Sequence, residues 1–260
     1  MNRLRWAISL VFVVVVGWSG FRAAADDSVV NSPHDLSARG RGIIRAARET
    51  EICIFCHTPH NAAPQTPLWN RETPTTHYRI YASSTLDARV DQPSGPSKMC
   101  LSCHDGSLAL GAVLSEPFTR PILTTPRTMP PGPADLTSDL SDDHPISFRY
   151  DRALASADRQ IRVPELVSRE LPLGRHGKMH CTTCHDPHDN SLGNFLRVTD
   201  RYASLCVTCH NMEGWRGSSH ARSKARTGGR TVDPREQLNY RTVSENGCLN
   251  CHKIHSATER

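Results

Sequence analysis

Hydrophobic residues are sparse and irregularly spaced along most of this chain, and the N-terminus contains its one long apolar run. That run, Trp6–Val16, follows Arg3 and Arg5 and precedes three alanines at positions 23–25. This layout is typical of a cleaved secretory signal peptide. The run falls short of the roughly 20 apolar residues that span a bilayer. We therefore expect residues 1–25 to be a signal peptide, with an uncleaved anchor as the alternative.

The remaining pattern predicts few regular elements. It allows a short helix at Ile43–Glu49, a short strand at Tyr78–Leu86 and a short helix that ends at Leu114. Eighteen Pro and sixteen Gly argue against longer elements. Hydrophobic content of 37% and aromatic content of 6% are low for 260 residues. We predict a mainly irregular fold with short α-helices and little β-structure. Side chains alone would provide too little apolar surface to build the core of such a fold.

All ten cysteines fall into five C-x-x-C-H motifs. This spacing is the attachment signature of c-type haem, because two thiols on one turn can each add to a porphyrin vinyl group and the next residue then lies beneath the iron. Zinc knuckles and a disulfide framework are the alternatives, but zinc sites would pair two C-x-x-C units without a His after each. The sequence therefore predicts a haem-organised protein with five haem c groups. The thioether cysteines are Cys53, Cys56, Cys100, Cys103, Cys181, Cys184, Cys206, Cys209, Cys248 and Cys251, and the proximal iron ligands are His57, His104, His185, His210 and His252.

A second set of histidines repeats together with the motifs. The repeating unit is a leading His, then C-x-x-C-H-x-x-H, then C-x-x-C-H; it occurs twice in full and a third time without its last motif. Each full unit supplies two haems and two spare histidines, the number that bis-histidine iron needs. The candidate distal ligands are His34, His60, His144, His188, His220 and His255.

A histidine three positions after a proximal ligand lies about one helical turn on, so it cannot reach the opposite face of its own porphyrin. We therefore assign His60 and His188 to the second and fourth haems. The leading histidines, His34, His144 and His220, are then expected to bind the irons of the first, third and fifth haems.

Six candidates for five irons leave His255 as the surplus. We expect it to point away from the fifth haem. It could cap a haem of a second subunit in a homo-oligomer or filament, line a docking edge, or be an exposed leftover of duplication. His77, His176 and His180 fall outside the repeat and are interpreted as surface residues or as neighbours of a haem.

The motifs divide the chain into a dihaem unit at 26–116, a Pro-rich linker at 117–141, a second dihaem unit at 142–214 and a single-haem unit at 215–260. The formal charge of +5 falls to about +2 without the three arginines of the signal peptide, and ten haem propionates would make the holoprotein acidic. We therefore expect no nucleic-acid partner.

These residues resemble the doubled C-x-x-C-H family of multihaem cytochromes c. The similar segments are SPHDLS, CIFCHTPHNA, CLSCHDGSLA, DDHPISF, CTTCHDPHD with FLR, LCVTCH and SSHA, and they cover most of residues 31–255. The resemblance implies a haem-organised fold of short helices and long loops. It also implies electron transfer between respiratory enzymes, quinol oxidases or extracellular acceptors, and some relatives polymerise into filaments.

We accordingly expect a periplasmic or extracellular electron carrier with mostly bis-histidine haems and redox proteins as partners. The competing interpretation is a multihaem oxidoreductase of the nitrite or hydroxylamine type with one open haem. Pentahaem nitrite reductases typically bind the catalytic haem through C-x-x-C-K, and this chain has no such motif. No catalytic residue is therefore assigned.

Overall fold

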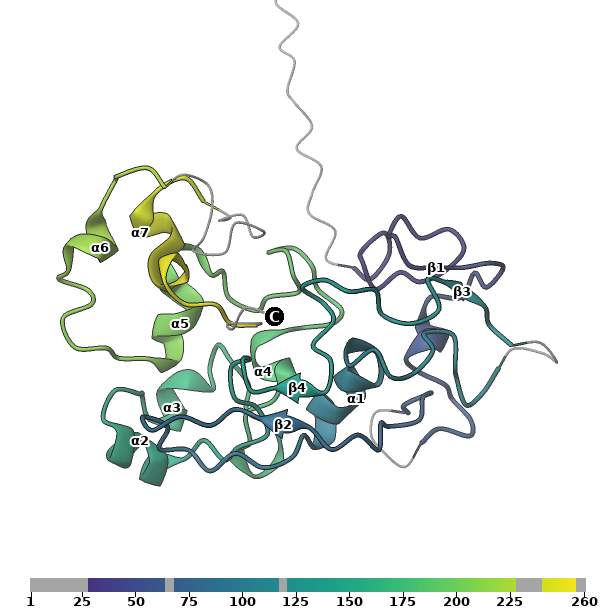
Figure 1. The fold of residues 1–260 in the computed structure, drawn as a ribbon, viewed down its shortest axis with the longest axis horizontal. Helices are drawn as coiled ribbons and strands as arrows, with labels where there is room; N and C mark the ends of the chain where they lie inside the picture. The colour runs from purple at the N-terminus through teal and green to yellow at the C-terminus, as the bar shows by residue number, and fades with distance from the viewer. Residues whose placement is uncertain (1–27, 64–67, 117–120, 228–239, 256–260) are drawn as a thin grey trace, which may run out of the picture.

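The structure is a computed structural model that describes residues 28–63, 68–116, 121–227 and 240–255. The expected signal peptide at 1–25 lies outside these residues. Within the described part of the chain, no helix is both long enough and apolar enough to cross a membrane. Long loops connect short elements (Figure 1), so the expectation of an irregular fold with short helices and little strand is confirmed.

The regular elements in the described ranges are helices of at most ten residues and strands of two residues. Pro96 near the start of α1 suits a helix N-terminus, where its missing N–H is not needed. α2 is capped by the Asp151 carboxylate, which accepts from the Leu154 N–H at 2.9 Å. The helices are α1 (Gly95–His104), α2 (Arg152–Asp158), α3 (Pro164–Val167), α4 (Cys181–Cys184), α5 (Ser204–Cys209), α6 (Ser219–Arg222) and α7 (Val243–Asn246). Single 3-10 turns are η1 (Cys53–Phe55), η2 (Arg175–Gly177), η3 (Arg201–Ala203) and η4 (Gly247–Asn250).

Two small sheets join the first part of the chain to the Pro-rich stretch. β1 (Arg45–Ala46) pairs antiparallel with β3 (Thr124–Thr125), and β2 (Arg79–Ile80) pairs parallel with β4 (Asp139–Leu140). The Pro-rich stretch therefore runs extended against the segments that surround the first two motifs. The division of the chain into separate units stays a prediction.

Three local expectations are corrected. The helix expected at Ile43–Glu49 is absent, since backbone groups there pair with β3 and with Leu36 instead. The strand expected at Tyr78–Leu86 is limited to β2. The helix of the second motif begins before the motif, contains it and ends at His104, because Gly106 has φ +69° and turns the chain out of the helix.

The largest cluster of buried apolar side chains lies around α3 and α5. Two smaller clusters form near the first and second motifs. The large cluster contains Phe148, Tyr150, Val167, Leu171, Met179, Leu205 and Cys209. The smaller ones contain Leu36, Ala46, Phe55 and Ile122, and Tyr78, Leu101 and Leu140. Motif cysteines are thus part of, or packed against, the apolar interior, which places the candidate site inside the molecule.

Candidate functional site

Each of the five C-x-x-C-H motifs lies on a single helical turn. They occupy η1, the end of α1, α4, α5 and η4. In four of them the histidine N–H donates to the carbonyl of the first cysteine: His57 to Cys53 (2.8 Å), His185 to Cys181 (2.9 Å), His210 to Cys206 (2.8 Å) and His252 to Cys248 (2.9 Å). This bond closes one turn of helix, and residues three apart on such a turn share a face. The geometry presents two thiols and one imidazole together, and all ten thiols are free.

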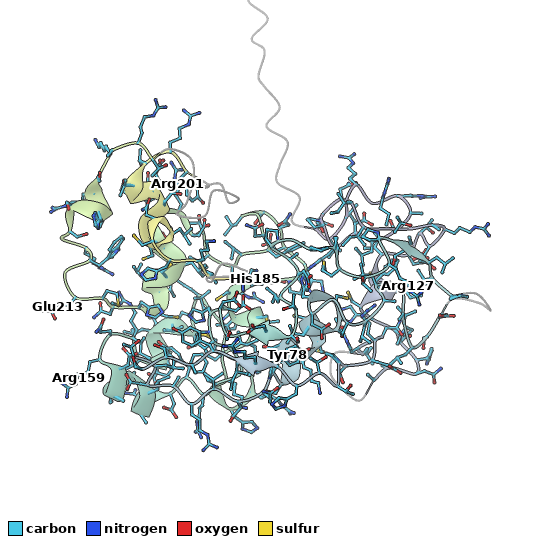
Figure 2. All side chains as sticks on the ribbon, in the orientation of Figure 1. Tyr78, Arg127, Arg159, His185, Arg201 and Glu213 are labelled. Atoms are coloured by element: carbon cyan, nitrogen blue, oxygen red, sulfur yellow. The ribbon has the colours of Figure 1, made fainter. Side chains whose placement is uncertain are left out.

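Four of the motif histidines face a second imidazole from a distant segment of the chain. In every pair the two ring centroids lie 6.1 to 6.3 Å apart. The pairs are His57 with His188 (6.1 Å), His104 with His34 (6.1 Å), His185 with His255 (6.3 Å) and His210 with His144 (6.3 Å). Figure 2 places His185 in the central part of the molecule.

This common spacing has a simple interpretation. A metal–imidazole bond is about 2 Å long, and about 1.1 Å separates the nitrogen from its ring centre, so two imidazoles on opposite sides of one metal have centroids about 6.2 Å apart. Direct stacking would bring rings closer, as between His34 and Phe195 at 4.1 Å. Each of the four gaps is therefore wide enough to hold one metal ion between the two imidazoles.

The hydrogen bonds of the rings fit the same interpretation. In five of these imidazoles Nδ1 faces an oxygen that can accept its proton, which leaves Nε2 available for a metal. These oxygens are the carbonyls of Pro187 for His34 (3.4 Å), Ala134 for His104 (2.7 Å), Pro145 for His144 (3.0 Å) and Asn194 for His185 (2.8 Å), and the Asp143 carboxylate for His255 (3.1 Å).

Burial also favours the neutral form of five of the eight rings. It lowers the pKa of His34 and of His144 to about 4 each, with neighbouring imidazoles adding to the effect. The pKa values of His104, His185 and His210 are lowered too, chiefly by burial. Since neutral imidazole is the form that binds metals, the environment favours the ligating state at neutral pH.

The structure corrects the expected assignment of distal histidines. His34 faces the second motif rather than the first, and His144 faces the fourth rather than the third. His188 faces the first motif instead of the fourth. His188 and His255 face a motif histidine other than the one three positions before them. Tertiary folding and not chain order therefore chooses the motif that each of them faces.

His255 is not a surplus group, because it faces His185 of the third motif. The spare histidine is instead His60, which is exposed, and no ring contact of His60 is found among the described residues. His220 and His252 are both exposed and do not lie at the spacing of the other four pairs. The fifth motif therefore differs from the first four.

Electrostatic interactions link a cysteine of each motif to a cysteine of the next. Burial raises the pKa of Cys56 and of Cys209 to about 12 each, and the partner thiol adds to the effect. The linked pairs are Cys56 with Cys103, Cys100 with Cys181, Cys184 with Cys209 and Cys206 with Cys248. Each motif is therefore close to the next one in the chain.

Comparison with protein families agrees with this geometry. Residues 175–214 match the family model described as Doubled CXXCH motif. This chain carries a doubled CXXCH motif. The match covers the third and fourth motifs and is consistent with a multihaem c-type cytochrome. It indicates covalently bound haem c with its iron, and electron transfer in general. A comparison with curated proteins found no match.

Next to the doubled CXXCH motif, His180 has a structural role that the sequence did not suggest. His180 is buried, and its Nδ1 lies 3.0 Å from the Ser97 hydroxyl oxygen. The same hydroxyl accepts from the Cys181 N–H at 3.2 Å. His180 therefore joins α1 to α4, the helices of the second and third motifs, whereas His77 and His176 are exposed.

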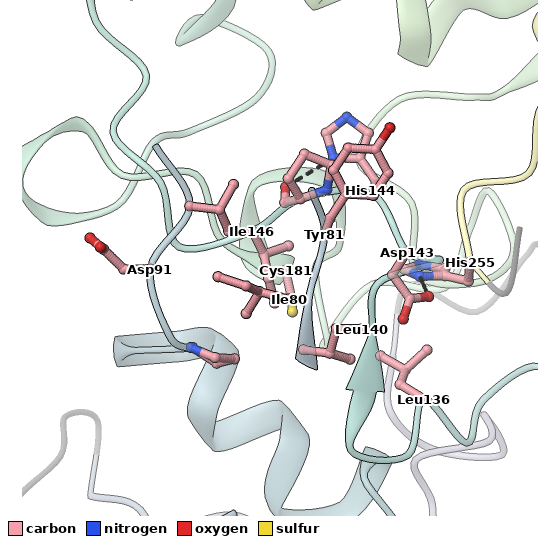
Figure 3. Close-up of a pocket in the computed structure, with 13 residues that line it drawn as sticks. Ile80, Tyr81, Asp91, Leu136, Leu140, Asp143, His144, Ile146, Cys181 and His255 are labelled. Atoms are coloured by element: carbon pink, nitrogen blue, oxygen red, sulfur yellow. Dashed lines mark hydrogen bonds and ion pairs between the residues drawn. The ribbon is translucent and has the colours of Figure 1, made fainter. Parts of the chain in front are cut away.

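Apolar side chains line the cavity beside the first cysteine of the doubled CXXCH motif. Figure 3 shows Ile80, Leu136, Leu140 and Ile146 around Cys181, with His255 at the same cavity. A porphyrin linked to Cys181 would find an apolar wall and an imidazole here. Among the described residues no group of three or more His, Cys, Asp or Glu side chains could hold a metal ion by itself.

Proposed function

We propose that the chain carries five c-type haems in single file and transfers electrons between redox proteins outside the cytoplasm. Haem iron supplies one-electron exchange between its ferric and ferrous states. The chain contributes covalent attachment through ten cysteines, axial ligation through histidines, and the spacing between sites.

The observation that carries this proposal is the set of four imidazole pairs with centroids 6.1 to 6.3 Å apart. One histidine of each pair comes from a C-x-x-C-H motif, and its partner comes from another part of the chain. Coincidence would not give the same spacing four times. Six-coordinate iron between two histidines has no free position for a substrate, so electron transfer fits these sites better than catalysis.

The order of the linked cysteine pairs supports a route through the protein. Neighbouring haems would be attached at thiols that lie close to each other, which favours direct electron transfer from one to the next. Cys53 and Cys251 are the two cysteines outside the four pairs, and both are exposed. The first and fifth haems are therefore the proposed points of electron exchange with partners.

At the fifth motif, we keep His220 as the proposed distal ligand of the iron bound by His252. The proposed location outside the cytoplasm rests on the sequence of the first 25 residues and on the fact that bacteria attach haem c outside the cytoplasm.

Two measurements on the secreted protein test the proposal. Intact mass should equal the mature chain plus five haems, and a mass with four haems or fewer would refute the number. Electron paramagnetic resonance of the oxidised protein should give low-spin signals for at least four haems. High-spin signals from two or more haems would refute the histidine pairs.

A further inference from the structure

We infer that the outer face of β1 and β3, together with the arginines around it, is the surface at which an acidic redox protein docks beside the first haem. This inference rests on the proposed function, because it takes the first haem as a point of electron exchange. We call this surface the β1–β3 face. It consists of two apolar side chains, Ile43 and Leu123, and of five arginines: Arg39, Arg41, Arg45, Arg48 and Arg127.

Side chains point alternately to two sides along this strand pair, as in any β-strand. Ala46 is buried, whereas Arg45 and Ala47 on either side of it are exposed. Ile122 is buried, and Leu123 after it is exposed. The Ala47 N–H donates to the Leu123 carbonyl at 2.8 Å, in continuation of the β1–β3 register. The exposed side chains of the two strands therefore share one outer face.

The inner face of the strands connects this surface to the first motif. Ala46 and Ile122 belong to the same buried cluster as Phe55, which lies between the two cysteines of that motif. Cys56 packs against the cluster, and Cys53 is exposed. Only this pair of strands therefore separates a protein bound to the outer face from the first motif.

The centre of the β1–β3 face is apolar. Ile43 lies two residues before β1 and is 80% exposed, and Leu123 lies directly before β3 and is 67% exposed. These are the two most exposed large apolar side chains among the described residues. A single exposed apolar side chain is ordinary on a protein surface, but two beside one strand pair form a small patch that a partner can bury.

Arginines surround this apolar centre. All five are exposed, and none of their guanidinium groups forms a hydrogen bond or an ion pair with another described residue. Figure 2 labels Arg127 on this side of the molecule. The stretch 35–51 contributes three carboxylates, of which Asp35 is buried and Glu49 accepts from the Glu51 N–H at 2.7 Å. The β1–β3 face therefore carries an excess of exposed positive charge.

This composition favours an acidic protein over a second copy of the chain or a lipid surface. A symmetric dimer through the face would bring the same arginines together, and like charges repel each other. Two exposed apolar side chains would give only weak attachment to a membrane, since stable anchoring needs more buried apolar area. Opposite charge would instead steer an acidic partner toward the face, and planar guanidinium groups bind its carboxylates well.

Charge reversal at two of the arginines tests the inference. The probe is reduced flavodoxin, a small acidic electron donor, and stopped-flow absorbance measures how fast it reduces the haems of the holoprotein. Arg41→Glu/Arg45→Glu should lower the rate about tenfold at low ionic strength, because steering by opposite charge is lost.

The matched control is Arg159→Glu/Arg169→Glu, which changes the net charge equally at two other exposed arginines. Figure 2 labels Arg159 at the opposite end of the molecule from Arg127. Because salt screens charges that are far from the docking surface, the control should lower the rate by less than about twofold. Equal losses in the two double variants, or no loss in Arg41→Glu/Arg45→Glu, would overturn the inference.

The salt dependence of the unaltered protein gives an independent test if the variant fails to mature. The holoprotein as a whole is expected to be acidic, so repulsion between net charges would make reduction by flavodoxin faster as salt is added. Local attraction at the β1–β3 face predicts the opposite, a rate that falls as salt is added. A rate that rises with salt would overturn the inference.

Two further outcomes would assign the face to another occupant. Vesicles that contain phosphatidylglycerol and bind the unaltered protein, but not Arg41→Glu/Arg45→Glu, would point to a lipid surface. A dimer that only this variant loses in analytical ultracentrifugation would point to a second copy. Either result overturns the acidic partner. The proposed function fails separately, if intact mass shows four haems or fewer or if a neutral small-molecule reductant leaves the haems oxidised.

Discussion

The first two motifs and the third and fourth motifs have the same pattern of cysteines and histidines, but different interactions hold them. Around the first pair, buried Asn70 and Arg71 form a polar network. Asn70 bonds to the backbone of the first motif, with its N–H 2.9 Å from the Cys56 carbonyl, and the Arg71 guanidinium donates to the Ser102 carbonyl of the second at 3.1 Å. Around the second pair, the largest apolar cluster packs against Cys184 and includes Cys209.

This difference shows that duplication of the ligand pattern did not duplicate the packing. The first region is specified by directional hydrogen bonds that connect two loops. The second is specified by apolar burial, which tolerates more variation in shape. Mutations should therefore affect the two regions by different mechanisms, although each region supports two sites of the same kind.

The largest effect on a haem is expected from a change at His255, which lies three positions after the histidine of the fifth motif. His255→Ala removes the partner of His185, so one of the low-spin haems should become high-spin. His60→Ala is the matched control, since His60 has the same place after the first motif and faces no motif histidine. Electron paramagnetic resonance and carbon monoxide binding measure the change. A high-spin haem in the His60 variant, or none in the His255 variant, would contradict the pairing.

Arg71→Ala should strongly destabilise the first region. The guanidinium is fully buried and donates to three backbone carbonyls, of Ser102, Ala109 and Leu110. Each buried acceptor left without a partner costs about 1–3 kcal/mol, so a loss of roughly 3–9 kcal/mol is expected in denaturant unfolding.

Arg79→Ala is the control for this variant. The Arg79 side chain is 75% exposed and pairs with Asp139 at 3.4 Å, so the change should be about 0.5 kcal/mol or less. Equal losses in the two arginine variants would show that the polar network has no special part in holding the first pair of motifs.

Leu171→Ala probes the apolar cluster of the second region. Leu171 is 1% exposed, and truncation of a buried leucine costs about 2–5 kcal/mol, depending on how far the cavity collapses. Leu166→Ala, at a side chain that is 54% exposed, should cost well under 1 kcal/mol. Thermal unfolding of the holoprotein separates the two outcomes, and similar midpoints would refute the role given to the cluster.

The smallest expected effect is the coupling between the two regions. None of the hydrogen-bond partners of Arg71 belongs to the apolar cluster of Leu171, so the double variant should lose the sum of the two single losses to within about 0.5 kcal/mol. A larger deviation in the double-mutant cycle would mean that the polar and apolar regions fold as one tightly coupled unit.

Much of the local chemistry could be predicted from the sequence. The C-x-x-C-H spacing predicted five turns that each present two thiols and an imidazole, and the structure forms them. Low hydrophobic content with frequent Pro and Gly predicted an irregular fold with short helices. The helix expected at Ile43–Glu49 failed, because pairing with β3 outweighed a weak local preference.

By itself, the sequence determined which residues form the turns that present two thiols and an imidazole, since the spacing within one turn is local. Only the tertiary structure decided which histidines face each other. His188 reaches His57 and His255 reaches His185 across large separations in the chain, and no local periodicity encodes such contacts. The burial of Asp143 beside His255 was equally hidden, because a charged residue carries no sign in the sequence of how much water will surround it. Local bonding rules act over a few residues, whereas partners and solvent exposure depend on how the whole chain packs.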